Sequence, residues 1–408
     1  MKLVIVSQYF WPENFIISKL ATKLVGLGHE VTVLTGKPNY PNGEIYPQYR
    51  AWGIDRENYQ GVDIIRIPII PRGRGGAINL MANYLSFAIM GIFLFPWLCR
   101  NIKVDGIFVF APSPILMAIP AVFLKWMKRI KLTVWVQDLW PESLSGTGFV
   151  KSKLILKSVE LVVKWIYSHS DCLLVQSEGF IHPVSKLSSI EKVIYYPNSV
   201  DGELYAIDQY ESPPDELSGL FKVLEQRFSI VFAGNIGTAQ SVETIVDAAR
   251  ILQLKDSEIQ LVVVGSGSRF DWLVEQSAKF ELTNLVLPGR FDVEMMPHIL
   301  SQADGLLVTL KNEEVFTYTV PSKLQAYLAM GKPVVTALNG EGARLVIDSG
   351  AGLSCDAENS IELANIIVEL KELDNQQRIE MGMKARQVFE KNFDMDKMVS
   401  KLEEILQK

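Results

Sequence analysis

The chain has 408 residues, of which 48% are apolar and 21% charged, so it is long enough for two domains with buried cores. Its three cysteines lie far apart, which excludes a disulfide scaffold and favours a reducing compartment. Residues 1–200 carry 21 Lys and Arg against 13 Asp and Glu, whereas residues 201–408 carry 19 against 33. The basic first half indicates an anionic partner, either a membrane surface or nucleic acid.

Short apolar runs alternate with helix-like stretches through the first half. The first run, Leu3–Val6, is too short for the core of a signal peptide and is typical of a strand. Helices are expected at Phe15–Leu27 and Ser152–Tyr167. The predicted strands of this half are Leu3–Val6, Val31–Leu34, Ile64–Ile67, Gly106–Phe110, Leu132–Val136, Cys172–Val175 and Val193–Tyr196.

The uncharged segment Gly75–Cys99 has a core, Leu80–Leu98, that is just long enough to cross a bilayer. Pro96 lies inside it, and the strands on both sides belong to one domain, which argues against a span. A second apolar segment, Pro114–Met127, ends among basic residues. We favour a helix in the interface of an anionic membrane, with a buried core helix and a true span as alternatives. The basic residues expected there are Arg72, Arg74, Arg100, Lys128, Arg129 and Lys131. Nucleic acid is not expected, because no recognisable basic module is present.

Two polar sites follow strands of the first half. Asp138 comes directly after the predicted strand Leu132–Val136, so it is a candidate to contact or deprotonate an acceptor hydroxyl. A turn or helix-cap aspartate is the alternative. Glu13 and Asn14 follow the first strand and could contact an acceptor or a phosphate, or could belong to the first helical turn.

The second half repeats the alternation of strand and helix, which predicts an α/β protein with two Rossmann-like domains of parallel sheet facing a central cleft. We place a first domain at 1–200, a second at 201–390, and a terminal helix at 391–408 that could pack back on the first. The predicted strands of this half are Ile230–Ala233, Gln260–Val264, Leu285–Leu287, Gly305–Leu310 and Pro333–Ala337.

Three of these strands run into glycine turns, which let a ligand approach the backbone closely. The residues concerned are Gly234, Asn235, Gly237, Gly265 and Arg290. Each turn by itself is an ordinary tight turn, and the first lacks the third glycine of a dinucleotide fingerprint. Three in one domain point to a nucleotide diphosphate.

The segment Val320–Val335 contains a short helix with both ends marked. Pro321 suits the first helical position, and Gly331 ends the helix before a strand. Ser322 and Lys323 at the open N-terminus would form an anion site with the free backbone N–H groups. An ordinary capped helix packed on a sheet is the alternative.

Jointly, these motifs resemble family 4 of the retaining glycosyltransferases. The motifs are Gly28-His29-Glu30-Val31, Pro197-Asn198-Ser199-Val200-Asp201, Gly234-Asn235-Ile236-Gly237, Gly265-Ser266-Gly267, Pro288-Gly289-Arg290 and Pro321-Ser322-Lys323. The opening Ser7-Gln8-Tyr9-Phe10-Trp11-Pro12 resembles a bacterial branch for O-antigen and exopolysaccharide, which includes colanic-acid and fucosamine transferases. The resemblance implies a GT-B fold, a nucleotide-sugar donor, by expectation a UDP-sugar, held by the second domain, and an acceptor held by the first.

The chain departs from the family where the diphosphate and ribose would be held. The family has two glutamates eight positions apart, where this chain has Thr317 and Gln325, and a basic pair where it has Asn235 and Gln240. Gln325 can still hydrogen-bond ribose hydroxyls. The departures place the burden of charge neutralisation on Lys323 and the helix N-terminus.

We expect catalysis by Asp138 and Lys323 without a metal or another cofactor. The Asp-x-Asp pair Asp394 and Asp396 marks a helix start, and the four histidines have no ligand spacing. Glu313 could reach sugar hydroxyls, with a solvated loop as the alternative.

The expected function is sugar transfer to a lipid-linked saccharide by a cytoplasmic protein peripheral on the inner face of the membrane. The alternatives are a nucleotide-sugar epimerase of the same fold and a non-catalytic nucleotide-binding membrane scaffold.

Overall fold

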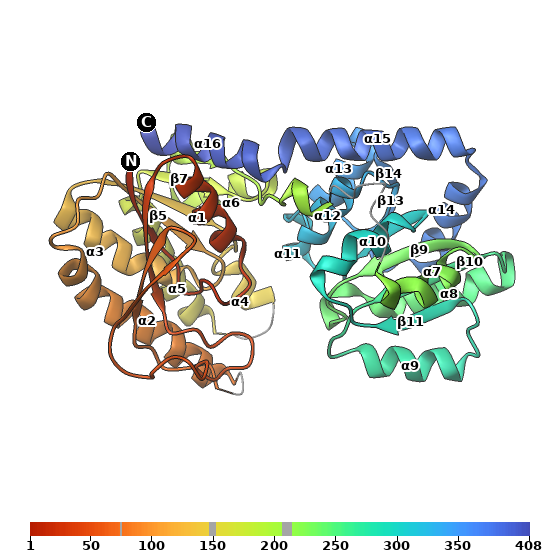
Figure 1. Cartoon of the computed structure of the whole chain (residues 1–408), viewed down its shortest axis with the longest axis horizontal. Helices are drawn as coiled ribbons and strands as arrows, with labels where there is room; N and C mark the ends of the chain where they lie inside the picture. Colours follow the sequence, from red (N-terminus) through yellow and green to blue (C-terminus); the bar gives the residue numbers. More distant parts are fainter. Residues whose placement is uncertain (74–75, 147–151, 206–213) are drawn as a thin grey trace. The chain divides into compact units, whose positions relative to one another are not determined.

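The computed structural model describes residues 1–73, 76–146, 152–205 and 214–408, which form two compact units (Figure 1). Unit 1 comprises Met1–Pro197 together with Asp396–Lys408, and unit 2 comprises Asn198–Met395. The change of unit after Pro197 lies three residues before the sequence-based boundary at 200. The chain then returns to unit 1 with its last helix, so unit 1 is discontinuous in sequence.

Unit 1 is built on an eight-stranded sheet in the order β3-β4-β2-β1-β5-β6-β7-β8. Every pairing is parallel except that of β3 with β4. β5 (GIFVFA) is buried along its whole length, as expected of a parallel strand covered on both faces. The strands are β1 Lys2–Val6, β2 Glu30–Gly36, β3 Asp55–Tyr59, β4 Val62–Ile67, β5 Gly106–Ala111, β6 Lys131–Val136, β7 Cys172–Val175 and β8 Val193–Tyr195.

The sequence did not predict β3, whose residues DRENY show no apolar run. It is an edge strand, so charged side chains are tolerated on it. A two-residue turn joins it to β4, with positive φ angles of 50° at Gln60 and 84° at Gly61, which is the geometry that favours a tight antiparallel hairpin.

Helices cover both faces of this sheet. α1 (Ile16–Gly26) joins β1 to β2, whereas α2 (Ala77–Cys99), α3 (Ile119–Lys128) and α5 (Lys153–His169) make the connections that run the opposite way across the sheet. Right-handed crossovers therefore place α1 on one face and α2, α3 and α5 on the other. The shorter elements are η1 Ile115–Ala118, α4 Glu142–Gly146, η2 Glu178–Phe180, α6 Ile181–Leu187 and η3 Ile190–Lys192.

The last helix, α16 (Met395–Gln407), completes unit 1. Tyr196 Oη donates to the Met398 carbonyl at 2.9 Å, and Lys401 Nζ donates to the Tyr195 carbonyl at 3.0 Å. His29 Nε2 lies 3.2 Å from a Glu403 carboxylate oxygen. These contacts join the last residues of the chain to the first strands and to the end of β8.

Unit 2 contains a six-stranded, wholly parallel sheet in the order β11-β10-β9-β12-β13-β14. The chain runs outwards from β9 in one direction and from β12 in the other. Ligands of such sheets bind beyond the carboxyl ends of the strands at this reversal. The strands are β9 Phe228–Ala233, β10 Ile259–Val264, β11 Leu285–Gly289, β12 Gly305–Thr309, β13 Val334–Ala337 and β14 Gly352–Cys355, the last of which was not predicted.

Successive residues of β9 alternate between the two core clusters of unit 2. Val231 and Ala233 belong to the cluster that contains Leu324 of α12 (Ser322–Met330). Ile230 and Phe232 belong to the cluster that contains Ile245 of α8 (Val242–Lys255). The remaining helices are η4 Gly202–Tyr205, η5 Asp215–Leu217, α7 Ser218–Leu224, η6 Thr238–Gln240, α9 Phe270–Lys279, η7 Val293–Met295, α10 Met296–Ser301, α11 Glu314–Thr317, α13 Glu341–Ser349, α14 Ser360–Glu372 and α15 Asn375–Asn392.

Candidate functional site

Unit 2 contains a cavity of about 360 Å³ at the carboxyl ends of β9, β10 and β11 and at the start of α12. One side is backbone-rich and polar, and the other is apolar. The lining residues are Tyr205, Ala233, Gly234, Asn235, Val264, Gly265, Ser266, Arg290, Phe291, Val293, Met296, Leu300, Lys323, Ala326 and Tyr327.

The polar side is formed by glycine turns whose backbones touch. Gly234 has a φ of 127° and Gly265 a φ of 142°, which side-chain-bearing residues rarely adopt. A Cβ on Gly265 would lie 1.9 Å from the Gly234 carbonyl oxygen, so only glycine fits there. The Gly265 N–H in turn donates to the Gly289 carbonyl at 2.7 Å, which links the second turn to the third.

α12 begins one residue later than the sequence indicated. Pro321 is the N-cap, with an extended ψ of 137°, and Ser322 is the first helical residue. The prediction that Pro321 occupies the first helical position was therefore wrong: its φ of −58° fits a helix, but its ψ does not. The other end agrees with the sequence, because Gly331 closes the helix with a left-handed φ of 65°.

Lys323 brings an unpaired positive charge to the cavity. Its Nζ is shielded from solvent, has no hydrogen-bond partner within the described ranges, and lies 3.4 Å from the centre of the Phe232 ring. It also lies 3.4 Å from where a Cβ on Gly234 would be. Burial lowers the pKa of Lys323 from 10.5 to about 7. A buried ammonium without a carboxylate is costly, and a bound anion would remove that cost.

The cavity holds five of the nine residues predicted to bind the donor: Gly234, Asn235, Gly265, Arg290 and Lys323. The other four, Gly237, Pro321, Ser322 and Gln325, do not line it. The Gly237 N–H donates to Gln240 Oε1 at 3.1 Å. Gln240 thus closes the first glycine turn, where the family pattern has a basic residue.

Gln325 is buried on α12, with 1% of its surface exposed. Neither its amide oxygen nor its amide nitrogen has a hydrogen-bond partner in the part of the chain that the structure describes. Buried polar groups in folded proteins are nearly always paired, and leaving one unpaired costs about 1–3 kcal/mol. The first turn of α12 therefore contains two shielded polar groups without hydrogen-bond partners among the described residues, the Lys323 ammonium and the Gln325 amide.

The apolar side of the cavity was not predicted. Tyr205, Phe291 and Met296 form part of it, and Tyr327 of α12 also lines the cavity. Tyr327 Oη accepts from the Ala233 N–H at 2.7 Å, which fixes α12 against the end of β9. Phe291 directly follows the predicted residue Arg290, so the sequence contained a signal for its place at the cavity. Tyr205 lies far away in sequence and had no such signal.

In unit 1, Glu13 acts as a bridge between two loops. Its carboxylate accepts from the backbone N–H groups of Phe10, Asn39 and Tyr40, at 3.2, 2.8 and 2.8 Å. Only 2% of the residue is exposed, and burial raises its pKa to about 7 against the opposing effect of these bonds. The neighbouring Asn14 is exposed.

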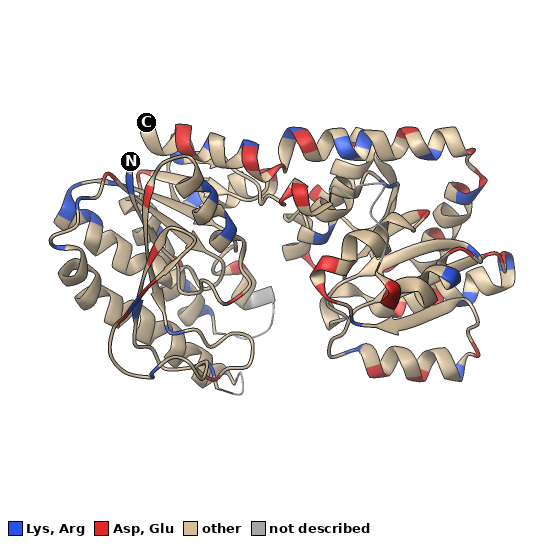
Figure 2. Cartoon of the chain, viewed as in Figure 1, with Lys and Arg blue, Asp and Glu red and all other residues tan. Residues whose placement is uncertain are grey.

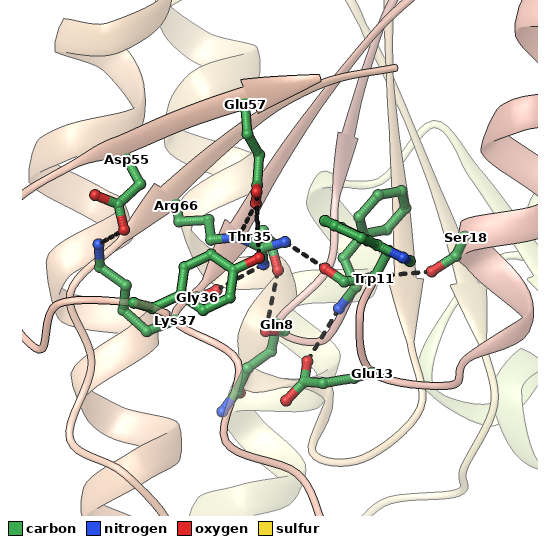
Figure 3. A network of polar contacts seen from close by, with 12 residues as sticks. Gln8, Trp11, Glu13, Ser18, Thr35, Gly36, Lys37, Asp55, Glu57 and Arg66 are labelled. Carbon is green, nitrogen blue, oxygen red and sulfur yellow. Dashed lines mark hydrogen bonds and ion pairs between the residues drawn. The ribbon is translucent and has the colours of Figure 1, made fainter. Parts of the chain in front are cut away.

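Around Glu13, two buried basic residues are each paired with an acid (Figure 3). Lys37 pairs with Asp55, and Arg66 pairs with Glu57 while also donating to the carbonyl oxygens of Trp11 and Gly36. Each pair joins a fully buried basic side chain to β3, the edge strand. The acidic residues of β3 therefore have a structural function.

The other predicted residues are not among those that line the cavity. Asp138 follows β6, where its two carboxylate oxygens accept from Ser143 Oγ and Trp140 Nε1, and burial raises its pKa. Glu313 is exposed at the N-cap of α11. Within the described ranges, no group of three or more His, Cys, Asp and Glu is arranged to hold a metal ion.

α2 has apolar residues on both its buried and its exposed sides. Phe87 and Phe95 are fully buried against the rest of unit 1, whereas Ile78 is 85% and Phe93 72% exposed. In Figure 2 the helix carries no charge along its length. Among the described residues it is the one helix whose length and composition would allow a membrane span. We define the apolar surface as the exposed residues of α2, namely Ile78, Met81, Leu85, Ile89, Phe93 and Trp97.

Basic residues lie near both ends of α2. Arg72 precedes it, Arg100 caps its C-terminus over the Trp97 ring, and Lys128 of α3 donates to the Arg100 carbonyl at 3.2 Å. Arg129 is exposed, and Lys131 binds the carbonyl of the last residue, Lys408. Arg74, also predicted for this surface, lies outside the described residues.

Comparisons with known proteins agree with this architecture. The family "Glycosyl transferases group 1" matches residues 221–388, and "Glycosyl transferase 4-like domain" matches residues 15–198. A probable glycosyltransferase, WbjE of Pseudomonas aeruginosa, is 25% identical over 69% of each chain. A putative colanic acid biosynthesis glycosyl transferase, WcaI of Escherichia coli K12, is 24% identical over 83% of each chain. The crystal structure of Anabaena Alr3699/HepE in complex with UDP covers all of both chains with a TM-score of 0.72 at 16% identity.

Two Rossmann-like α/β units with largely parallel sheets, together with this structural likeness, confirm the predicted GT-B fold class. With both of its halves matched, the chain belongs to family 4 of the glycosyltransferases.

Proposed function

We propose that the chain transfers a sugar, with retention of its configuration, from a UDP-sugar to a lipid-linked saccharide of a bacterial surface polysaccharide such as O-antigen or exopolysaccharide. The observation that carries the proposal is the unpaired, buried Lys323 ammonium at a cavity walled by glycine backbone. The names of WbjE and WcaI and the UDP in the HepE structure support it.

The donor diphosphate would lie between Lys323 and the turns at Gly234 and Gly265. The glycines leave the backbone bare there, and the ammonium together with the N-terminus of α12 would stabilise the charge that develops on the leaving diphosphate. Arg290 supplies a second cation at the cavity wall. This arrangement supports metal-independent transfer, since a helix end and a lysine can provide the charge stabilisation that a metal supplies elsewhere.

The nucleoside would occupy the apolar side of the cavity. Phe291 and Tyr205 provide flat apolar surface for a base, and the unpaired Gln325 amide offers a donor and an acceptor for ribose hydroxyls. The remaining predicted donor residues would contribute indirectly. Pro321 and Ser322 would shape the start of α12, and Gly237 would shape the first glycine turn. Glu313 remains a candidate for a sugar hydroxyl, because it is exposed just before α11.

Asp138 is our candidate for the acceptor hydroxyl. Burial favours its protonated form and therefore a basic character once it is ionised. Glu13 is assigned to loop fixation rather than to the acceptor, because its carboxylate already accepts three backbone hydrogen bonds. The exposed Asn14 beside it stays available to an acceptor.

The acceptor would be reached at the cytoplasmic face of the cell membrane, on which the protein would be peripheral. The apolar surface of α2 would enter the lipid interface, and Arg72, Arg74, Arg100, Lys128, Arg129 and Lys131 would meet anionic headgroups. α2 packs one face into unit 1, which supports interfacial contact rather than a span.

Titration with nucleotides tests the donor site directly. We expect UDP to bind more tightly than ADP or GDP, and Lys323→Met to weaken UDP binding by about 1–3 kcal/mol, the range for a charged hydrogen bond. Lys279→Met, which removes an exposed lysine of α9, should leave the affinity unchanged. Equal UDP affinity in both variants would contradict the role of Lys323.

Activity then separates transfer from the alternatives. Transfer of sugar to a prenyl-diphosphate-linked saccharide, undiminished in excess chelator, is the expected result. Epimerisation of the UDP-sugar without an acceptor would favour the epimerase, and tight UDP binding without turnover would favour the scaffold. Complete dependence on added Mg²⁺ or Mn²⁺ would contradict metal independence.

A further inference from the structure

Arg72 is held rigidly beside the start of α2. Its Nη1 donates to Tyr9 Oη at 2.8 Å, and its guanidinium lies over the rings of Tyr9 and Tyr40, at 5.7 and 5.1 Å from their centres. Its backbone N–H donates to Asn39 Oδ1 at 3.0 Å. A planar guanidinium held against two aromatic rings and by a hydrogen bond loses little further freedom when it binds a ligand.

The positive charge of Arg72 is not neutralised. By contrast, Lys37 and Arg66, two buried basic side chains described at this end of the sheet, each have a carboxylate partner. Among the residues that the structure describes, Arg72 forms no ion pair, and the one hydrogen-bond acceptor of its side chain is the neutral Tyr9 hydroxyl. The nearby Glu13 carboxylate is occupied by three backbone N–H groups. Four of the five N–H donors of the Arg72 side chain therefore stay available to an anion.

The location suits one kind of anion. Arg72 follows β4, and its partners follow β1 and β2, so the site lies at the carboxyl ends of three neighbouring strands. It also lies five residues before Ala77, the first residue of α2, whose first exposed apolar side chains are Ile78 and Met81. The end of the sheet and the beginning of the apolar surface therefore meet at Arg72.

We infer that Arg72, with Tyr9 and Tyr40, binds the phosphate that joins the lipid of the acceptor to its saccharide. This inference rests on the lipid-linked acceptor of the proposed function. The apolar surface takes the hydrocarbon chain, the guanidinium takes two phosphate oxygens in a bidentate contact, and the 38% exposed Tyr40 offers a ring face to the first sugar. Arg72 is thereby a specificity residue that selects phosphate-linked acceptors over neutral ones.

Calorimetric titration with farnesyl diphosphate tests this inference without donor or turnover. We expect the intact chain to bind farnesyl diphosphate but not farnesol, and Arg72→Gln to weaken the binding at least tenfold. Arg72→Lys keeps the charge but loses the bidentate geometry of the guanidinium, so its affinity for farnesyl diphosphate should lie between those of the wild type and Arg72→Gln. Arg56→Gln, an equal charge change at an exposed position of β3, should have no effect. Unchanged binding in both Arg72 variants would overturn the inference.

Two controls identify the site and the source of the phosphate. Lys323→Met should bind UDP more weakly but keep its affinity for farnesyl diphosphate. The reverse pattern would place the lipid diphosphate in unit 2 and overturn the inference. Arg72→Gln should still co-sediment with phosphatidylglycerol vesicles, because the apolar surface and the other basic residues near α2 remain. Loss of vesicle binding with farnesyl diphosphate affinity intact would assign Arg72 to membrane headgroups alone and would overturn the inference. Failure of the wild type to bind UDP would contradict the proposed function alone, and failure to bind farnesyl diphosphate would contradict this inference alone.

Discussion

At the scale of residues, two groups on α12 carry most of the functional argument. The Nζ of Lys323 and the amide of Gln325 are both shielded from solvent, and both lack hydrogen-bond partners within the described ranges. The sequence predicted the functional importance of each, because a lysine at a helix start and a glutamine at a glutamate position are visible in one dimension. It could not predict that they would be unpaired, because pairing depends on which side chains of other elements come near.

The pKa of Lys323 leads to a prediction about pH. Burial lowers it to about 7 in the free protein, and a bound diphosphate favours the ammonium form, so the pKa in the complex is higher. Between these two values, binding takes up a proton, and UDP affinity must fall as pH rises. We expect a decline approaching about tenfold per pH unit from pH 7.5 to pH 9, where UDP itself is fully ionised.

Calorimetry in buffers of different ionisation enthalpy measures both quantities together. Proton uptake and the decline in affinity should vanish in Lys323→Met and persist in Lys279→Met. A slope that survives in Lys323→Met would assign the titration to another group.

At the scale of elements, the sequence left three interpretations of α2 open: an interfacial helix, a buried core helix and a membrane span. Composition alone cannot separate an interfacial helix from a core helix, because both are apolar. The fold separates their faces: Phe87, Gly91 and Phe95 pack inwards, and the apolar surface points outwards. A Cβ on Gly91 would lie 2.8 Å from Pro120 of α3, so this glycine sets the close packing of the two helices.

Phe93→Glu tests the apolar surface at a strongly exposed position. Because Phe93 is 72% exposed, the change should leave the unfolding temperature nearly unaltered. Burying a phenylalanine in an apolar phase contributes about 1.5–3 kcal/mol, so binding to phosphatidylglycerol vesicles should weaken about tenfold or more. Leu254→Glu on α8, a 90% exposed leucine in unit 2, is the matched control. Equal vesicle binding by the two variants in a sedimentation assay would reject the surface.

At the scale of the whole molecule, the chain builds unit 1 from both of its ends. α16 supplies the Met398 carbonyl to the buried Tyr196 hydroxyl and covers the end of β8 through Lys401. Unit 2 is a single continuous segment. The two units therefore depend differently on the C-terminus.

Deleting residues 396–408 should destabilise unit 1 selectively. The deletion leaves the Tyr196 hydroxyl without its acceptor. It also removes Val399 and Leu402, which are 1% and 0% exposed in the intact chain, and so uncovers the apolar surface of unit 1 on which they pack. We expect an early thermal transition of unit 1, while UDP still raises the melting temperature of unit 2. A single unfolding transition at the wild-type temperature would show that α16 is dispensable.

The sequence by itself determined the α/β class, the largely parallel sheets and the glycine turns that line the cavity of unit 2, because these depend on local periodicity and on backbone conformations that side-chain-bearing residues rarely adopt. It missed β3 and β14, which are an edge strand of charged residues and a four-residue strand, since both are stabilised by neighbours rather than by their own pattern.

Only the tertiary structure decided which residues meet. It placed Tyr205 and Phe291 in the lining of one cavity, left Lys323 without a hydrogen-bond partner among the described residues, and used the Glu13 carboxylate to link two loops. It also placed an unpaired arginine beside the start of an apolar helix. The physical reason is common to all of these: burial and pairing are properties of contacts between distant segments, and no local pattern encodes them.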